Sequence, residues 1–481
     1  MSARTTGQSN TSSVKNRASV SETQVPVNKS QSQGQESGDL DYAFGGYDFG
    51  GPIGVSIMMI GFPIIMWYLW ICATFKGGKL WLPAEGQSLA DFCNEFYQLF
   101  YNHALPSLST YVGFYLFFFV QAVFYATLPG VTGYGLPLKH LGGKALPYFC
   151  NAVYSFYTTI VIALALHFTG VFPLYTIIDK FGEIMTVCIF TGFFFSFALY
   201  FFTIATGAQH RMSGNFIYDV FMGANLNPRT GIIDWKMFFE VRLPWFILFF
   251  ITLGAAFKQY EVYGYVTPQV AFILLAHWLY VNACCKGEQL IITSWDMFYE
   301  KFGFMLIFWN IAGVPFTYCH CTLYLINHKP SDYQWPLTYN IFLYVLLLIS
   351  YYFFDTANSQ KNAFRQMRQG TLIVRKAFPQ LPYRTIKNPN FIQCKNGGTL
   401  LTSGWFGYAR KANYTADYVM CLSWALMCGT DSLLPFFFPL FFFIVLVHRA
   451  YRDIERLEKK YGDDYDEYKK VVPYIFIPYI F

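Results

Sequence analysis

The sequence predicts an all-α protein that crosses a membrane about ten times. Of its 481 residues, 54% are hydrophobic and only 13% are charged, whereas soluble domains usually carry about 25% charged residues. Its apolar runs approach or reach the roughly 20 residues that a helix needs to cross the bilayer core. Lys and Arg are concentrated in a few connecting segments, as they are in the cytosolic loops of multi-pass proteins.

The first 45 residues differ in composition from the rest of the chain. They are rich in Ser, Gln and Asn and contain almost nothing apolar to bury, so we expect a disordered cytosolic tail (1–45). The tail has no apolar core of the kind found in cleaved signal peptides. We therefore expect the first span to act as an uncleaved signal.

Ten apolar segments are the candidate spans, and the last two of them are short. They are 52–74, 108–128, 148–172, 183–206, 243–258, 266–285, 302–326, 337–355, 415–429 and 432–448. The stretch "CGTDSLLP" between the last two has the composition of a tight turn. We group the spans into N-terminal transmembrane helices (46–290) and C-terminal transmembrane helices (291–481).

The basic residues predict the orientation of these spans. The segment 356–416 contains ten basic residues and no Asp or Glu, and both the loop 207–242 and the C-terminal tail are also basic. With ten spans, all three segments fall on one side of the membrane, together with both termini. We expect this side to be the cytosol.

The sequence lacks the motifs that are typical of several function classes. The eleven cysteines include no CxxC pair, so we expect neither a disulfide framework nor a zinc or other metal site. Neither GxGxxG nor GxxxxGK followed by Ser or Thr occurs, which excludes a standard Rossmann or P-loop domain. No Ser/His/Asp or HExxH pattern stands out, and we expect no nucleic-acid partner.

The stretch "FFDTANSQKNAFRQMRQG" (353–370) leaves the end of a span with a helical spacing of polar residues. Residues three or four apart share a helix face, which here would carry Asp355, Asn358, Lys361, Asn362 and Arg365. Lys361 and Arg365 would present two cations side by side, which suits a phosphate or a pyrophosphate. The alternative is a basic anchor on the cytosolic rim, and this stretch alone leaves both open.

The stretch "TSGWFGYARKANYTAD" (402–417) places aromatic and basic residues before Asn413, Tyr414 and Asp417 at the mouth of the next span. Aromatic residues at this depth commonly form an interfacial belt, which is the simpler interpretation. Asn413 and Asp417, however, lie where water becomes scarce, so their polar groups need partners.

The stretch "LVHRAYRDIERLEKKYGDDYDEYKK" (446–470) follows the last span directly. Arg449 and Asp453 are one turn apart and can pair, and Asp453, Leu457 and Tyr461 continue one helix face. An exposed, salt-bridged helix is the alternative. Two features oppose it: the charges begin inside the bilayer rim, where they are costly, and the chain ends in "VVPYIFIPYIF", which is apolar enough to fold back onto the membrane domain.

The stretch 294–325 carries Glu300, Asn310, Tyr318 and His320 in or next to a span. A tyrosine or histidine at membrane depth can donate a proton, although a lone buried tyrosine is more often a packing residue. Together, the four stretches predict a basic, aromatic cytosolic pocket that suits an anionic cofactor and opens onto an apolar interior. Such a pocket fits an enzyme that joins a soluble phosphate-bearing cofactor to a lipid.

The same stretches resemble the sterol reductase family, which includes sterol C-14 reductase, 7-dehydrocholesterol reductase and the membrane part of the lamin B receptor. The segments "GNFIYDVFMGANLNPRTGIIDWKMFFEVRLPW" (214–245) and "LVHRAYRDIERLEKKYG" (446–462) match two family signatures. "LPYFCNA" and "YYFFDTANSQKNAFR" resemble the fungal C-24(28) branch in particular. In other branches the central span resembles the pattern GD…PF.Y..Q. In this sequence Asn310 and His320 occupy the corresponding positions.

The resemblance implies NADPH-dependent reduction of a sterol double bond in the endoplasmic reticulum membrane. In the C-24(28) branch the side-chain methylene is reduced, in the last step to ergosterol. By motif match, NADPH contacts fall on Lys361, Arg365, Leu401, Phe406, Asn413, Tyr414, Arg449, Asp453, Leu457, Tyr461 and Tyr468. In this family Trp is frequent at the position of Phe406, and Cys is frequent at the position of Leu457. Both replacements keep the wall of the implied NADPH site apolar. The implied partners are a sterol substrate, the lipid bilayer and, potentially, other sterol-biosynthesis enzymes.

This chemistry implies an acid on one side of the alkene and NADPH on the other, in a pocket that excludes water. We expect Tyr318 to be the proton donor, relayed through His320 or Glu300. Three alternatives stay open: a C-14 or C-7 reductase of the same family, an isoprenylcysteine-type membrane methyltransferase, and a non-enzymatic sterol-binding protein. The "RHPxY"-like element of those methyltransferases is absent from the sequence.

Overall fold

The computed structural model describes residues 44–370, 372 and 378–480, all within one compact unit, Gly38–Phe481. The predicted disordered tail (1–45) therefore lies almost entirely outside the described residues. The first part of the described chain contains α1 (Gly51–Phe75), α2 (Leu89–His103), α3 (Leu108–Thr127), β1 (Val131–Leu138), β2 (Lys144–Cys150), α4 (Ala152–Phe168), α5 (Thr176–Asp179), α6 (Phe181–Ala205), α7 (Phe216–Met222), β3 (Arg229–Thr230), β4 (Ile233–Asp234), α8 (Trp235–Val241), α9 (Leu243–Tyr263), α10 (Pro268–Lys286) and α11 (Glu288–Ile291).

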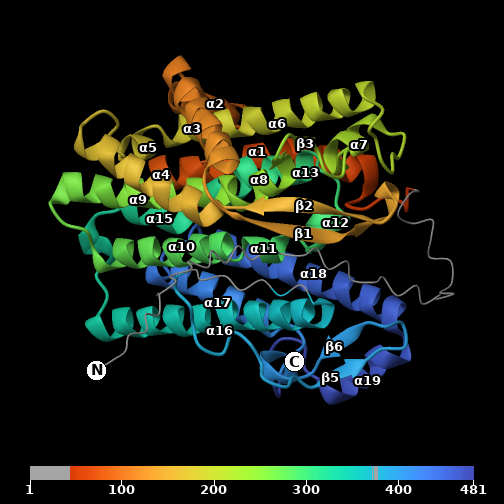
Figure 1. Cartoon of the computed structure of the whole chain (residues 1–481). Helices are drawn as coiled ribbons and strands as arrows, with labels where there is room; N and C mark the ends of the chain where they lie inside the picture. The colour runs from red at the N-terminus through yellow and green to blue at the C-terminus, as the bar shows by residue number, and fades with distance from the viewer. Residues whose placement is uncertain (1–43, 371, 373–377, 481) are drawn as a thin grey trace, which may run out of the picture. The chain divides into compact units, whose positions relative to one another are not determined.

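The remaining elements form the second part of the chain (Figure 1). They are α12 (Trp295–Phe298), α13 (Phe304–Phe308), the π-helical turn η2 (Trp309–Gly313), α14 (Val314–Thr317), α15 (His320–Asn327), α16 (Leu337–Gln369), β5 (Phe391–Gln393), β6 (Thr399–Leu401), the 3-10 turn η4 (Gly404–Gly407), α17 (Ala412–Met427), α18 (Phe437–Tyr461) and α19 (Asp463–Val471). The three pairs of strands are small antiparallel hairpins, so the fold is mainly helical, as predicted.

Each of the ten predicted spans overlaps a helix. Within the described residues, seven helical segments are long and apolar enough to cross a membrane: Gly51–Phe75, Leu108–Thr127, Phe181–Ala205, Trp235–Tyr263, Pro268–Lys286, Phe304–Asn327 and Leu337–Gln369. The chain is thus a multi-pass membrane protein. The other predicted spans fall on the shorter apolar helix α4, on α17 and on α18, whose second half is charged, so the count of ten stays a prediction.

Two elements differ from the sequence prediction. The predicted span 148–172 begins as strand β2, which pairs antiparallel with β1 from Val131 opposite Cys150, and the helix starts only at Ala152. Helix α2 was not predicted, because its apolar residues alternate with polar ones and none of its side chains is buried.

Local chemistry explains where the helices begin and end. At α10, the Thr267 hydroxyl accepts a hydrogen bond from the Val270 N–H, and Pro268 occupies the first turn, where its missing N–H costs nothing. Helix α16 ends at Gly370, whose φ of 68° is easily adopted only by glycine. The first half of this 33-residue helix is apolar, and its second half is polar.

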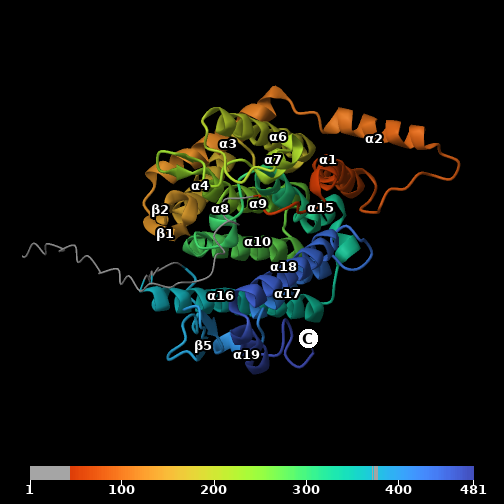
Figure 2. The ribbon, with the colours of Figure 1, turned by 90° about the vertical axis from the view of Figure 1, so that its right-hand side faces the viewer.

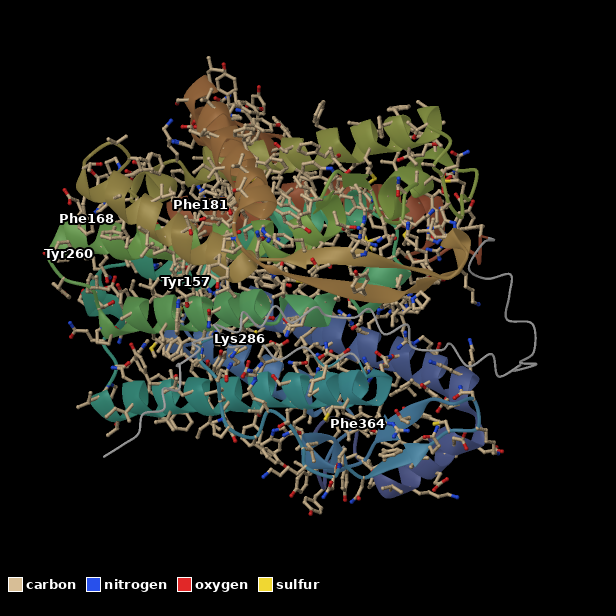
Figure 3. All side chains as sticks on the ribbon, in the orientation of Figure 1. Tyr157, Phe168, Phe181, Tyr260, Lys286 and Phe364 are labelled. Carbon is tan, nitrogen blue, oxygen red and sulfur yellow. The ribbon has the colours of Figure 1, made fainter. Side chains whose placement is uncertain are left out.

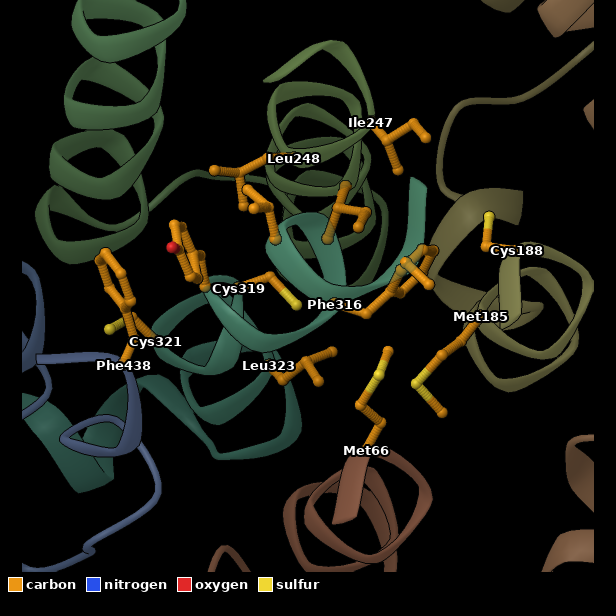
Figure 4. Packing of buried hydrophobic residues seen from close by; sticks show 14 of the residues in the cluster. Met66, Met185, Cys188, Ile247, Leu248, Phe316, Cys319, Cys321, Leu323 and Phe438 are labelled. Carbon is orange, nitrogen blue, oxygen red and sulfur yellow. The ribbon is translucent and has the colours of Figure 1, made fainter. Parts of the chain in front are cut away.

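The core surrounds the central span formed by α13, η2, α14 and α15. Figure 4 shows Met66 of α1 and Met185 of α6 close to each other beside Phe316 of this span, and these three side chains and Leu248 of α9 are buried. On the other side, Tyr318 faces α18, where Phe438 stacks on it at a ring-centroid distance of 3.7 Å. The central span is therefore enclosed by helices from both parts of the chain.

The elements that carry the predicted cofactor residues lie together. Helix α16 packs against α17, and α17 against α18. Figures 1 and 2 show β5 and α19 beyond α16, on its side away from α10. Figure 3 shows Lys286 between α10 and α16 and Phe364 on the opposite side of α16.

Candidate cofactor and substrate site

The polar face of α16 contacts three different segments. The Asp355 carboxylate pairs with the Lys286 Nζ of α10 at 2.6 Å and lies 3.8 Å from the Arg384 Nε. One turn later, the Asn358 Oδ1 accepts a hydrogen bond from the Asn413 Nδ2 at 3.1 Å. The first part of the face predicted from spacing, at Asp355 and Asn358, therefore faces other segments of the protein.

Lys361 and Arg365 occupy the C-terminal part of this face, and their spacing predicts that they share it. The Lys361 Nζ lies 5.1 Å from the centroid of the Phe406 ring, a cation–π distance. Arg365 is exposed. Neither side chain has a hydrogen-bond or ion-pair partner among the described residues, so both cations are available to a ligand.

Asp453 of α18 lies at the centre of a group of cations. Its carboxylate accepts hydrogen bonds from Lys411 and from Arg456, and it interacts electrostatically with Lys361 and Arg365. Burial alone would raise the pKa of Asp453, but Lys411 and Arg456 outweigh this effect and lower it to about 2. We call Lys361, Arg365, Lys411 and Arg456 with Asp453 the cation cluster.

The cation cluster carries an excess of positive charge. Its five members are four cations and one carboxylate, and only Lys411 and Arg456 contact that carboxylate directly, while neighbouring like charges repel one another. Burial also lowers the pKa of Lys411, although Asp453 opposes this shift. An anion with several charges would relieve the repulsion.

The pairing predicted between Arg449 and Asp453 is wrong. The Arg449 guanidinium pairs instead with the Asp296 carboxylate of α12, at 3.7 Å, while Asp453 pairs with Lys411 and Arg456. Arg456 also lies 4.8 Å above the Trp295 ring. Two cations of α18 thus attach this helix to α12, which the spacing within one helix could not indicate.

Apolar side chains form the wall beside the cation cluster. Leu401 and Phe406 pack with Ala357 and Phe364 of α16. Leu457, Tyr461 and Tyr468 pack against the β5–β6 hairpin through Cys394 and Leu400. The predicted residues therefore gather on α16, β6, η4 and the charged ends of α17 to α19.

The chain end folds back onto the start of α17, as its composition predicts. The carbonyls of Tyr474 and Ile475 accept hydrogen bonds from the backbone N–H groups of Arg410 and Lys411, at 2.9 and 2.8 Å. The Phe476 carbonyl accepts one from the Thr415 hydroxyl at 2.8 Å. These contacts hold Lys411 where it meets Asp453.

The predicted catalytic residues do not form one group. Tyr318 stacks on Phe438 and is 8% exposed. His320 is fully buried, and neither ring nitrogen has a hydrogen-bond partner among the described residues. Glu300 precedes α13 and accepts a hydrogen bond from the Trp295 Nε1 at 2.7 Å. Because the helical rise from Phe304 to Thr317 is about 20 Å, Glu300 does not contact Tyr318.

Burial shifts the pKa of Glu300 upward, and the nearby Asp296 carboxylate shifts it in the same direction. The Trp295 hydrogen bond and the cations Arg452 and Arg211 act against this shift. Glu300 is therefore held beside α12 by the Trp295 hydrogen bond, and not in the surroundings of Tyr318.

Lys411 and Arg456 were not among the predicted site residues. Lys411 could have been found from its place beside Asn413, since a lysine at the mouth of a span needs a partner. Arg456 could not, because the aromatic ring that it covers lies 161 positions earlier in the chain, at Trp295.

The residues present fit a dinucleotide with several phosphates. Phosphate oxygens form strong hydrogen bonds with Lys and Arg, and the cation cluster supplies four such side chains. The Asn413 Oδ1 is buried and has no hydrogen-bond partner among the described residues, so it can accept a bond from a ligand hydroxyl or amide. The apolar wall of Leu401, Phe406 and Leu457 suits a flat ring.

The fold and this cluster of side chains define a multi-pass membrane protein with a cation-rich site. Residues 45–481 match the model of the Ergosterol biosynthesis ERG4/ERG24 family. The Delta(24(24(1)))-sterol reductase of Gibberella zeae is 51% identical over 442 residues, which cover 92% of this chain and 74% of the relative. The Delta(24(24(1)))-sterol reductase erg4A of Aspergillus fumigatus is 52% identical over 436 residues, with 90% and 93% covered.

More distant relatives carry other names. The Delta(14)-sterol reductase of Dictyostelium discoideum is 34% identical over 451 residues, which cover 93% of this chain and 94% of the relative. With a family match over nearly its whole length, the chain belongs to the ERG4/ERG24 family of membrane-bound sterol reductases. The expected family, the oxidoreductase class and the link to sterol biosynthesis are thereby confirmed.

Proposed function

We propose that this protein reduces the C-24(28) methylene double bond of a sterol side chain with NADPH, as the last step of ergosterol biosynthesis. The observation that carries the choice of bond is the difference in similarity. The two Delta(24(24(1)))-sterol reductases are 51% and 52% identical to the chain, whereas the Delta(14)-sterol reductase of Dictyostelium is 34% identical. This difference favours C-24(28) over C-14.

The cation cluster supports NADPH as the cofactor. Lys361, Arg365, Lys411 and Arg456 would hold its phosphate groups, and Asn413 would accept a hydrogen bond from one of its hydroxyl or amide groups. NADPH carries an additional phosphate on the ribose of its adenosine and therefore has more negative charge than NADH. This charge matches a cluster with more cations than carboxylates. When bound, NADPH supplies the hydride.

The chain's own residues supply the proton. A tyrosine keeps its proton at neutral pH, and Tyr318 holds one beside Phe438 in the buried interior. Protonation of the terminal methylene carbon places positive charge on C-24, and the faces of nearby aromatic rings stabilise such a charge. The enclosed apolar surroundings exclude water, which would otherwise trap the cation.

We also propose that the protein lies in the endoplasmic reticulum membrane with both termini in the cytosol. The basic segment 356–416 and the charged end of α18 belong to the same side as the cation cluster. Cytosolic placement gives the cluster access to soluble NADPH. The positive-inside bias supports this orientation.

Product analysis of the purified protein tests the proposed function. The full chain in lipid nanodiscs receives a sterol with a 24(28)-methylene group and NADPH that carries deuterium at its transferable position. We expect a product with one deuterium from the cofactor at C-24 and one proton from solvent at C-28. Substrates with a C-14 or C-7 double bond serve as controls, and faster reduction of either would contradict the proposed bond.

A further inference from the structure

Two hydrogen bonds fix Trp405 of the η4 turn to helix α16. Its indole Nε1 donates to the Thr356 hydroxyl at 2.9 Å, and its backbone N–H donates to the Gln360 Oε1 at 3.1 Å. The indole ring also packs on Phe353, with the ring centroids 4.2 Å apart. Thr356 and Gln360 lie four positions apart and so share one face of the helix. Helix α16 therefore holds Trp405 both by its side chain and by its backbone.

The two partners of Trp405 on α16 are buried, and each has a second hydrogen bond. Thr356 is fully buried, and Gln360 is 1% exposed. The Thr356 hydroxyl donates to the Tyr352 carbonyl at 2.6 Å, so its oxygen is left to accept from the indole. The Gln360 Nε2 donates to the Tyr383 carbonyl at 2.8 Å. Because water has little access here, losing either bond to Trp405 leaves a buried polar group unpaired.

Gly404 allows the turn to approach α16 closely. Its φ is 63°, in the left-handed region that glycine adopts without strain. A Cβ atom at this position would lie 2.3 Å from the Gln360 Oε1, which is well inside van der Waals contact. The backbone before Trp405 thus has room only for a glycine.

The residue after Trp405 belongs to the proposed NADPH site. Phe406 is 2% exposed, and its ring lies 5.1 Å from the Lys361 Nζ. Lys361 directly follows Gln360 on α16. The same turn of the helix therefore presents the cation and holds the chain segment that carries the ring. The hydrogen bonds of Trp405 fix how the ring and the cation lie relative to each other.

We propose that Thr356 and Gln360 are positioning residues of the NADPH site. Through Trp405 they hold the Phe406 ring beside the Lys361 cation. The inference rests on the proposed function and names residues that support the site without touching the cofactor. When a bond to Trp405 is lost, Phe406 is no longer held in place, so the affinity for NADPH falls.

The substitution Thr356→Val tests the proposal, because it keeps the shape of the side chain and removes the oxygen that accepts the indole N–H. With the full chain in lipid nanodiscs, fluorescence titration measures the Kd for NADPH. We expect this Kd to rise roughly fivefold, the factor that corresponds to one lost hydrogen bond. The kcat at saturating NADPH should equal that of the wild type. Thr356→Ser keeps the oxygen and should restore the wild-type Kd.

Removing the other partner of the bond should have the same effect. Trp405→Phe lacks the indole N–H, so its Kd for NADPH should also rise. The double variant Thr356→Val/Trp405→Phe should bind NADPH no more weakly than Trp405→Phe alone, because both substitutions remove one shared bond. Gln360→Met loses two hydrogen bonds and should raise the Kd at least as much as Thr356→Val.

Thr186→Val is the matched control. Thr186 of α6 is also fully buried, and its hydroxyl donates to the Gly182 carbonyl at 2.9 Å and accepts from the Trp67 Nε1 at 3.0 Å. In Figures 1 and 2, α10 lies between α6 and α16. Thr186→Val therefore loses the same kind of hydrogen bond away from the cation cluster, and its Kd for NADPH should equal that of the wild type.

A wild-type Kd in the Thr356→Val protein would overturn the proposal. So would an equal rise in the Kd of Thr186→Val, or a Thr356→Ser protein that binds as weakly as Thr356→Val, because the lost bond would then act only on the stability of the fold. If the wild type binds NADPH but reduces a bond other than C-24(28), the proposed bond fails by itself, and the same titrations still test the role of Thr356.

Discussion

Lys411 shows how one charged side chain is kept at the rim of the bundle. Its side chain is 5% exposed and that of its partner Asp453 is 21% exposed, so little water is present to replace either partner. By contrast, Lys395 and Asp463 form an ion pair at 3.1 Å with side chains that are 77% and 89% exposed. Losing one partner of a buried pair leaves an uncompensated charge, whereas exposed pairs contribute little.

Replacing Lys411 should therefore destabilise the protein. We expect Lys411→Gln to lower the free energy of unfolding by roughly 1–3 kcal/mol, while Lys395→Gln should cause no measurable change. The pKa of Asp453 is lowered to about 2, so its ionised form stabilises the fold above the unfolded pKa of about 4. The contribution is lost as the pH falls through about 2.

Unfolding of the detergent-solubilised protein by denaturant, at neutral pH and in acid, measures this difference. The gap between wild type and Lys411→Gln should stay constant at neutral pH and close in acid. Equal effects of Lys411→Gln and Lys395→Gln would show that burial does not strengthen the pair.

At the scale of elements, apolar content predicted the spanning helices but not the elements between them. Strand β2 and the start of α4 form one continuous apolar stretch of sequence. Mean hydropathy measures how apolar a stretch is, but it does not show whether the apolar residues recur with the period of a strand or of a helix. Only the pairing with β1 shows where the strand ends and the helix begins. Helix α2 was missed for the opposite reason, since it has no continuous apolar run.

The site was predictable where it lies within one element. The spacing of Lys361 and Arg365 predicted that both lie on one face of α16. The other candidate residues were predicted because they match motifs of the sterol reductase family. Contacts between elements were not predictable: Asp453 meets Lys411, which lies 42 positions away, and Arg449 meets Asp296. Such pairs depend on how α12, α17 and α18 pack, which no local pattern contains.

The C-terminal segment should matter for cofactor binding because it holds the start of α17. Deleting residues 473–481 removes the carbonyls that accept hydrogen bonds from Arg410, Lys411 and Thr415. We expect the affinity for NADPH to fall roughly tenfold, about 1.4 kcal/mol, because about half of the free energy of the three lost hydrogen bonds, about 1 kcal/mol each, would then be needed to order the site.

Fluorescence titration with NADPH measures the effect. Deleting only residues 478–481 keeps all three carbonyls and is the matched control, with an affinity equal to that of the full chain. If both deletions behaved alike, the hydrogen bonds to Tyr474, Ile475 and Phe476 would not position the site.

At the scale of the whole molecule, the fold brings a water-facing site against an apolar interior. Helix α16 carries Lys361 in its polar second half, and Asp355, six positions earlier, pairs with α10. Helix α18 likewise joins Phe438, which stacks on Tyr318, to Asp453 in the cation cluster. The same two helices therefore join the proposed NADPH site to the buried side chains proposed to face the sterol.

Equilibrium binding of NADPH to the variant Lys361→Glu/Arg365→Glu tests the central claim most directly. Each cation is expected to lose charge-assisted hydrogen bonds of about 1.5–3 kcal/mol, so the affinity should fall by more than about 100-fold. The variant Lys459→Glu/Lys470→Glu makes the same change in net charge at exposed positions and should bind like the wild type. Wild-type affinity in the Lys361→Glu/Arg365→Glu protein would contradict the account.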